Sequence, residues 1–174
     1  MNLYLRLIWT WLGARFKPRI SPGDEIEMRF RVWPNDLDVN GHMNNGRYMT
    51  ITDLGVVEYF SRTGFLPRAL KRGWRPVYGG SVISFRRGLR PFTTYTLRFA
   101  MVCWDERWSY LRFAFEHKGR TMAVGYAKGA VVGRDGIVGS RESFGIIGYD
   151  GRSPEFPASV QAWIAADQLI LNED

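Results

Sequence analysis

Apolar and polar residues alternate with a period of two in several segments of this chain, and this pattern predicts strands. In residues 25–33 the apolar side chains alternate with Glu27, Arg29 and Arg31, and Pro34 ends the pattern. Four later segments show similar strand-like patterns and are separated by short polar turns: residues 77–89, 94–104, 108–117 and 121–132.

Two segments have helical patterns instead. From about residue 47 to residue 63, apolar side chains cover most of a helix circumference, which is typical of a helix buried inside a protein. Asn44 or Asn45 can cap its start, and Gly64 can close its end. Residues 153–171 form a second predicted helix with an apolar face.

The order of these elements predicts the fold class. One strand, one long buried helix, about four more strands and a terminal helix suit an α+β domain, because an antiparallel sheet can turn one face to a core. The expected packing is a curved antiparallel sheet of about five strands wrapped round the single helix. At 174 residues the chain has the length of one domain.

The N-terminal segment has its own character. Residues 1–12 are mainly apolar and aromatic and are interrupted by the charge of Arg6, and Arg15, Lys17 and Arg19 follow. The apolar run is too short to span a bilayer, and its charges follow it rather than precede it as in a secretory signal. A helix docked on the domain is one interpretation, and contact with a membrane interface is the other.

Composition excludes several kinds of site. With one cysteine, Cys103, and two histidines, the chain has no internal disulfide and too few ligands for a Cys/His zinc site. Cys103 lies in a strand-like run and is expected to be buried and inert. The P-loop, G-x-G-x-x-G and G-x-S-x-G motifs are all missing from the sequence.

Charge is concentrated in one stretch. The net charge is +7, and between Glu58 and Asp105 there are nine basic residues and no acidic one. Such a field indicates an anionic partner, and the alternative is a solvated basic face. Within this stretch, Arg86, Arg87 and Arg90 are candidate ligands for phosphate groups, because guanidinium groups suit phosphate oxygens.

The loop before the long helix has the densest chemistry. Residues 35–48 hold two carboxylates, one histidine and four asparagines. The free N–H groups of a helix N-terminus, here near Asn45 and Gly46, can stabilise an oxyanion. A nearby carboxylate can activate water or attack a carbonyl. Helix capping alone is the competing interpretation, although it requires only one such residue.

This loop, Asn35-Asp-Leu-Asp-Val-Asn-Gly-His-Met-Asn-Asn-Gly-Arg-Tyr48, resembles the signature of the hot-dog-fold acyl thioesterases. It is similar to the 4-hydroxybenzoyl-CoA thioesterase-like family, the plant acyl-ACP thioesterases and the thioesterase superfamily member six branch. The resemblance covers residues 24–150 as a hot-dog domain, with residues 1–23 and 151–174 as extensions. It implies metal-free hydrolysis of acyl thioesters by a homodimer or a dimer of dimers.

The resemblance also implies roles for single residues. Asp38 matches the catalytic aspartate, and Asn40 and His42 match the residues that act with it. A further acidic or cysteine residue in a separate segment has no evident counterpart in the sequence. We therefore expect Asp38 as general base or nucleophile, Asn40 and His42 as positioning groups, and Asn45 and Gly46 as oxyanion donors. With the coenzyme A thioester that the resemblance implies as substrate, we assign its phosphates to Arg86, Arg87 and Arg90.

Our prediction is a cytoplasmic acyl-CoA or acyl-ACP thioesterase without a cofactor, with candidate membrane contact through its N-terminus. Two alternatives stay open: a non-catalytic acyl- or lipid-binding module at a membrane, and a hot-dog enoyl-CoA hydratase. Nucleic-acid binding is disfavoured, because no recognised nucleic-acid module is present.

Overall fold

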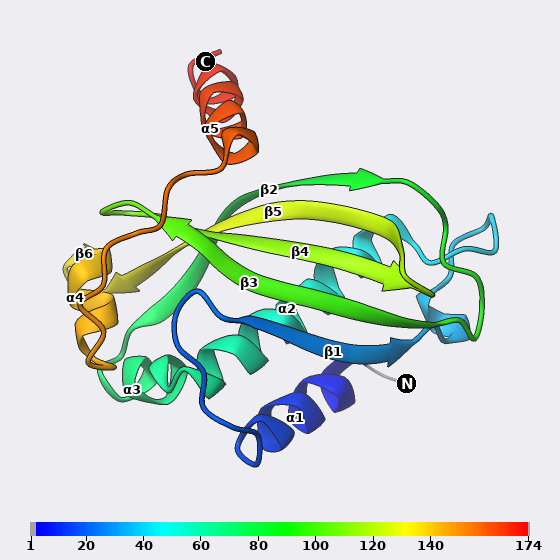
Figure 1. Ribbon diagram of the computed structural model, residues 1–174, viewed down its shortest axis with the longest axis horizontal. Coiled ribbons are helices and arrows are strands. Elements are labelled where there is room, and N and C mark those ends of the chain that lie inside the picture. Colours follow the sequence, from blue (N-terminus) through cyan, green and yellow to red (C-terminus); the bar gives the residue numbers. More distant parts are fainter. Residues whose placement is uncertain (1–2, 174) are drawn as a thin grey trace.

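A curved antiparallel sheet covers one long helix in the computed structural model, which describes residues 3–173 (Figure 1). Met1, Asn2 and Asp174, which belong to the predicted terminal extensions, lie outside the described residues. The strands of the sheet are β1 (Glu25–Arg31), β2 (Arg75–Phe85), β3 (Thr94–Trp104), β4 (Ser109–His117), β5 (Arg120–Gly133) and β6 (Gly136–Val138).

Strand order places β1 and β2 at opposite sides of the main sheet. The order is β1-β3-β4-β5-β2, and the short β6 pairs with β5. All of these pairings are antiparallel. The helices are α1 (Leu3–Ala14), η1 (a 3-10 turn, Pro34–Asp36), α2 (Asn45–Arg62), α3 (Phe65–Lys71), α4 (Ser140–Gly145) and α5 (Ala158–Leu171).

The structure confirms the predicted α+β arrangement of a curved sheet round one buried helix. The predicted strand 94–104 has the bounds of β3, but β2 ends at Phe85 rather than residue 89. Arg86, Arg87 and Arg90 therefore lie in the connection between β2 and β3. The pattern did not predict β6 and α4, which are only three and six residues long.

Helix α2 lies against the concave face of the sheet and carries the middle of the core. Ile51, Leu54 and Tyr59 are buried in one cluster with Phe99 and other side chains of the strands. Gly55 allows the close approach, because a Cβ there would lie 2.9 Å from the Phe99 ring. Asn44 caps the helix, as one of the two predicted caps.

Helix α1 packs along α2 on the side away from the sheet, so docking of the N-terminal segment on the domain is confirmed (Figure 1). Leu3 and Leu7 pack against the core, and Arg6 is buried. The other face of α1 is apolar and exposed, and includes Leu5, Ile8 and Trp9. No helix in residues 3–173 is long and apolar enough to cross a bilayer.

Helix α5 stands on the opposite face of the sheet (Figure 1). Val160 closes a small cluster there with Cys103 and Tyr110, and Lys128 of β5 pairs with Asp167 of α5. Cys103 is buried as expected, and this burial raises the pKa of its thiol to about 11. The thiol is therefore mostly protonated at neutral pH and poorly nucleophilic.

Candidate active site

The segment between η1 and α2 folds as a small hairpin that brings Asp38 and His42 together. The Asp38 N–H donates to the His42 carbonyl oxygen over 2.8 Å, and Leu37 and Met43 form a β-bridge. Gly41 closes the turn with a φ of 71°, in the left-handed region that favours glycine. Two of the predicted catalytic residues thus lie opposite each other before the N-terminus of α2.

The carboxylate of Asp38 is half-buried and turned toward its own turn. Its Oδ1 accepts the N–H groups of Asn40, at 2.9 Å, and His42, at 3.4 Å. Tyr48 lies close to it on α2: burial chiefly, and the charge of Asp38 to a smaller degree, raise the pKa of the Tyr48 phenol. The Asn40 side chain is exposed.

The connection between β2 and β3 packs directly on this hairpin. Met43 donates its N–H to the Leu89 carbonyl oxygen over 2.8 Å. The His42 ring lies against Gly88, where a Cβ would come within 2.6 Å of ring atom Cδ2. The fold therefore brings the exposed segment with Arg86, Arg87 and Arg90 next to the loop that holds Asp38.

The other basic residues of the same stretch lie elsewhere. Arg68, Lys71 and Arg72 are on or next to α3, before β2 begins. The 11 residues of β2 separate them from Arg86, a length of about 36 Å at roughly 3.3 Å per residue. The stretch that looked like one basic segment therefore contributes to two separate basic surfaces, while Arg98 on β3 pairs with Glu25 and Glu27.

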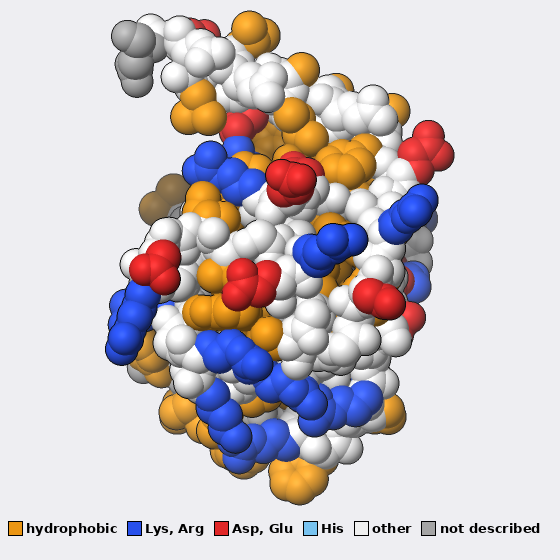
Figure 2. Space-filling model, turned by 90° about the vertical axis from the view of Figure 1, so that its left-hand side faces the viewer, with side chains coloured by type: hydrophobic (Ala, Val, Ile, Leu, Met, Phe, Trp, Pro, Cys, Tyr) orange, Lys and Arg blue, Asp and Glu red, His pale blue; other side chains and the backbone are white. Residues whose placement is uncertain are grey.

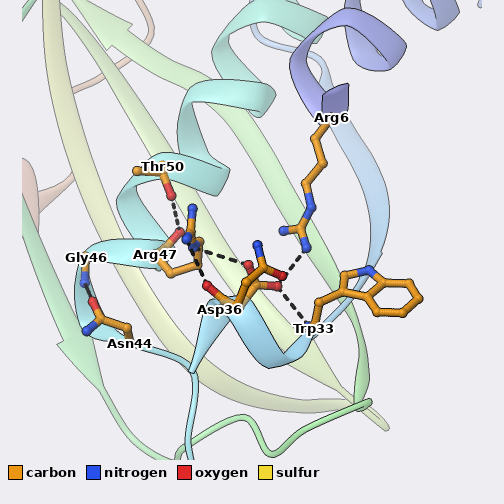
Figure 3. Close-up of polar contacts among 8 residues, drawn as sticks. Arg6, Trp33, Asp36, Asn44, Gly46, Arg47 and Thr50 are labelled. Atoms are coloured by element: carbon orange, nitrogen blue, oxygen red, sulfur yellow. Dashed lines mark hydrogen bonds and ion pairs between the residues drawn. The ribbon is translucent and has the colours of Figure 1, made fainter. Parts of the chain in front are cut away.

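The N-terminus of α2 offers fewer free donors than its sequence suggests. The Gly46 N–H donates to Asn44 Oδ1 over 2.8 Å (Figure 3), and the Arg47 N–H donates to the Asn44 carbonyl oxygen. Among the described residues, the Asn45 amide has no such partner. Of the two predicted oxyanion donors, Asn45 is thus available in this conformation and Gly46 is engaged in the cap.

Asp36 lies at the open end of the hairpin and holds it in place through ion pairs and a hydrogen bond. Its Oδ2 accepts from Arg6 Nη2 at 2.7 Å and from the Trp33 N–H at 2.9 Å, and Arg47 Nε lies 3.2 Å from its Oδ1 (Figure 3). The side chains of Arg6 and Asp36 are only 3% and 1% exposed. A charge this deeply buried requires partners, so Asp36 is suited to holding the loop rather than to reacting.

A cavity of about 380 Å³ runs along the second half of α2, between that helix and the edge strand β2. Its lining is mainly apolar and includes Val56, Phe60, Leu111 and Phe144. None of the lining residues belongs to the hairpin, and the cavity begins about two helical turns along α2.

Asp53 of α2 also lines this cavity, and sequence reasoning missed it. The residue as a whole is exposed, yet partial burial of its carboxyl group raises the pKa above the usual range of an aspartate. Tyr78 of β2 lines the same cavity. Burial, and to a smaller degree the charge of Asp53, raise the pKa of the Tyr78 phenol to about 12. The sequence feature that could have identified Asp53 is an acidic residue within the largely apolar sequence of a helix predicted to be buried.

Comparisons with known proteins agree with this geometry. The family model described as "Thioesterase-like superfamily" matches residues 32–164. Protein THEM6 of Xenopus laevis is 29% identical over 136 residues, which are 76% of this chain and 64% of that protein. Protein THEM6 of Drosophila melanogaster is 24% identical over 97% of this chain and 88% of its own.

Among solved structures, a gentisyl-coenzyme A thioesterase superposes with a TM-score of 0.62 at 18% identity, over 68% of this chain and 98% of its own. This likeness supports the hot-dog fold predicted from the loop motif. The family match begins directly after β1, includes the hairpin and α2, and ends in the middle of α5. The chain therefore belongs to the thioesterase-like superfamily.

Proposed function

We propose that this protein hydrolyses an acyl thioester of coenzyme A or of an acyl carrier protein, with Asp38 as the central catalytic group. The observation that carries the proposal is the hairpin that holds Asp38 opposite His42 at the N-terminus of a buried helix. Membership in a thioesterase superfamily supports the reaction class, and the gentisyl-coenzyme A thioesterase neighbour supports CoA as the thiol.

In this reaction Asp38 either takes a proton from water or attacks the thioester carbonyl itself. With Asp38 as base, the water oxygen bonds to the carbonyl carbon while the Asn45 N–H stabilises the oxyanion. Collapse of the tetrahedral species breaks the carbon–sulfur bond, and the thiolate takes up the proton that Asp38 accepted from water. With Asp38 as nucleophile, the thiolate leaves as an anhydride forms between the acyl group and Asp38, and water then hydrolyses this anhydride and frees Asp38. His42 and Asn40, beside Asp38, position the water and the thioester.

The acyl chain would follow α2 into the cavity between that helix and β2. Asp53 is eight residues beyond Asn45, so the cavity begins about 12 Å along the helix axis from the oxyanion donor. The apolar lining suits a hydrocarbon chain or an aromatic acyl group.

We assign the phosphates of CoA to Arg86, Arg87 and Arg90, since these exposed residues flank the hairpin. Reversing their charge, as in Arg87→Glu, should raise KM for an acyl-CoA and leave kcat nearly unchanged, because binding rather than chemistry is lost. Steady-state kinetics at low and high salt measures this, and the effect should shrink at high salt. Arg72→Glu, on the other basic surface, is the matched control.

A thioester of the same acyl group with pantetheine lacks the nucleotide phosphates, so its kinetics should barely respond to Arg87→Glu. Equal losses with both substrates would mean that these arginines are structural. If the arginine variants leave KM for acyl-CoA unchanged, the phosphates bind at another surface.

We further propose a homodimer joined through β2. One side of β2 pairs with β5, and its exposed residues include Val77, Tyr78, Val82 and Phe85. An exposed, apolar edge strand favours pairing with a second strand. Light scattering at micromolar concentration should give at least twice the 20.1 kDa chain mass. Val82→Lys should shift the species toward monomer, whereas Leu169→Lys on α5 should not. A wild-type monomer would contradict the proposal.

The exposed face of α1 is a candidate for peripheral contact with an anionic membrane. Trp9 of α1 and Phe16, two residues after the end of this helix, are 70% and 89% exposed, and aromatic side chains suit the bilayer interface. Arg19 and Arg68 converge on Gly64, where a Cβ would lie within 2.4 Å of both guanidinium groups. Figure 2 shows Lys and Arg side chains gathered next to hydrophobic ones at this end of the molecule.

Sedimentation with lipid vesicles measures this contact. We expect binding to vesicles that contain phosphatidylserine and weaker binding to phosphatidylcholine alone, because basic residues are attracted to anionic headgroups. Trp9→Glu and Arg68→Glu should both weaken binding. Equal binding to the two kinds of vesicle, or none to either, would refute an electrostatic lipid contact.

A further inference from the structure

The buried pair of Arg6 and Asp36 joins three parts of the chain at one carboxylate. Arg6 comes from α1, Asp36 ends η1, and Arg47 comes from the first turn of α2 (Figure 3). Arg6 and Asp36 are 30 residues apart in sequence. Helix α1 also lies outside the part of the chain that the family model matches, so its arginine reaches the hairpin from a segment beyond that match.

A short ladder of backbone contacts connects Asp36 to the proposed catalytic residues. The Asn44 N–H donates to the Asp36 carbonyl oxygen over 2.8 Å, the Leu37–Met43 bridge follows, and the Asp38 N–H then donates to the His42 carbonyl oxygen. Asp36 is at the open end of this hairpin, and Asp38 and His42 are two residues further along. A shift of Asp36 would therefore be passed directly to both.

Stability alone does not explain Arg6. A buried ion pair often adds little net stability over apolar residues of similar volume, because both charges lose their water. Within residues 3–173, Arg6 Nη1 and Asp36 Oδ1 are buried without a hydrogen bond, and the Arg47 guanidinium meets Oδ1 only as an ion pair. An apolar side chain at this position could dock α1 equally well. The particular contribution of Arg6 is to fix the position of one oxygen of Asp36.

We propose that Arg6 is a positioning residue for thioester hydrolysis: through Asp36 it holds the hairpin so that Asp38 and His42 face the substrate. The proposal rests on the proposed function. It makes α1 a part of the active-site support and not only a cover for α2. Because Arg47 also lies beside Asp36, loss of Arg6 leaves the carboxylate paired, and the hairpin loses one restraint.

The chain contains a matched control for this pair. Lys17 Nζ lies 2.7 Å from Glu58 Oε1, and Glu58 is 2% exposed. Glu58 also keeps a second cation, since Arg62 Nη1 lies 3.4 Å away. Lys17→Met therefore removes one cation of a buried carboxylate, as Arg6→Met does. The difference is that Glu58 lies near the C-terminal end of α2, far from the hairpin.

The test compares kcat, KM and melting temperature for Arg6→Met and Lys17→Met with a soluble acyl-pantetheine thioester. We expect Arg6→Met to lower kcat by about tenfold or more with little change in KM, since small misplacement of catalytic groups is costly. Lys17→Met should leave kcat unchanged. Arg6→Lys, which restores a cation, should recover most of the rate. Equal kcat in the wild type and Arg6→Met, or losses that follow melting temperature in both variants, would overturn the proposal.

Hydrogen exchange gives a readout that does not need activity. The amides of Asp38 and Asn44 should exchange faster in Arg6→Met and at the wild-type rate in Lys17→Met. Protection that is unchanged in Arg6→Met would overturn the positioning role. If the wild type has no thioesterase activity but exchange responds as expected, the proposed function fails and the structural coupling stands. If Arg6→Met gives no folded protein, Arg6→Gln, which keeps an N–H donor, enters the same comparison.

Discussion

Replacement of Asp38 by asparagine should lower kcat for an acyl-CoA at least about 10²-fold, the range expected for loss of an acid–base group. The reason is that an amide can neither accept a proton from water nor attack the thioester. An asparagine oxygen can still accept the N–H groups of Asn40 and His42. The hairpin should therefore keep its shape, and the loss should appear in kcat at an unchanged melting temperature.

Asp53→Asn is the informative control for this experiment. Asp53 is the carboxylate that lines the apolar cavity, and burial raises its pKa. If Asp38→Asn retains near-normal turnover and Asp53→Asn is inactive, the general base is on α2 and the assignment of Asp38 is wrong. If Asp38→Asn is inactive and Asp53→Asn mainly changes the preference for acyl groups, the assignment holds.

Asp36→Asn should have the largest effect on stability. Removing the acid leaves the Arg6 charge buried without compensation, and breaking a buried pair in this way costs about 3–5 kcal/mol of unfolding free energy. Arg6→Met should cost much less, because Arg47 remains beside Asp36. Denaturant unfolding of both variants measures this asymmetry.

The double variant Arg6→Met/Asp36→Asn completes the comparison. It removes both charges, so it should be more stable than Asp36→Asn alone. A double variant that loses the sum of the two single losses would show that the residues do not interact energetically. A loss of under about 0.5 kcal/mol for Asp36→Asn, the range of ordinary surface substitutions, would contradict this expectation.

Much of the fold could be predicted from periodicity, because the positions that carry it also face the core. Leu97 and Phe99 alternate with polar residues and are both fully buried. The pattern was less informative where the sheet is irregular. A bulge between Met101 and Cys103 moves Cys103 to the opposite face, under α5. Nothing in the local sequence marks that bulge.

The candidate site was partly visible in the sequence, since its hairpin is continuous in the chain. The contacts that join this hairpin to other segments of the chain were not visible in the sequence. Contact of Arg6 with Asp36 spans 30 residues, and Gly88 meets His42 only through the three-dimensional path of the β2–β3 connection. Gly46 was predicted as an oxyanion donor, but the Asn44 cap engages its N–H. Such contacts depend on tertiary packing, which periodicity does not report.

Thiol release from a panel of acyl-CoAs of different acyl length tests the central claim most directly. The purified protein should release one thiol for each carboxylic acid formed, with at least one substrate, and Asp38→Asn should abolish most of this release. Tight binding of acyl-CoA without thiol release would identify a binding module. Hydration of an enoyl-CoA with the thioester left intact would identify a hydratase, and either result would contradict a thioesterase.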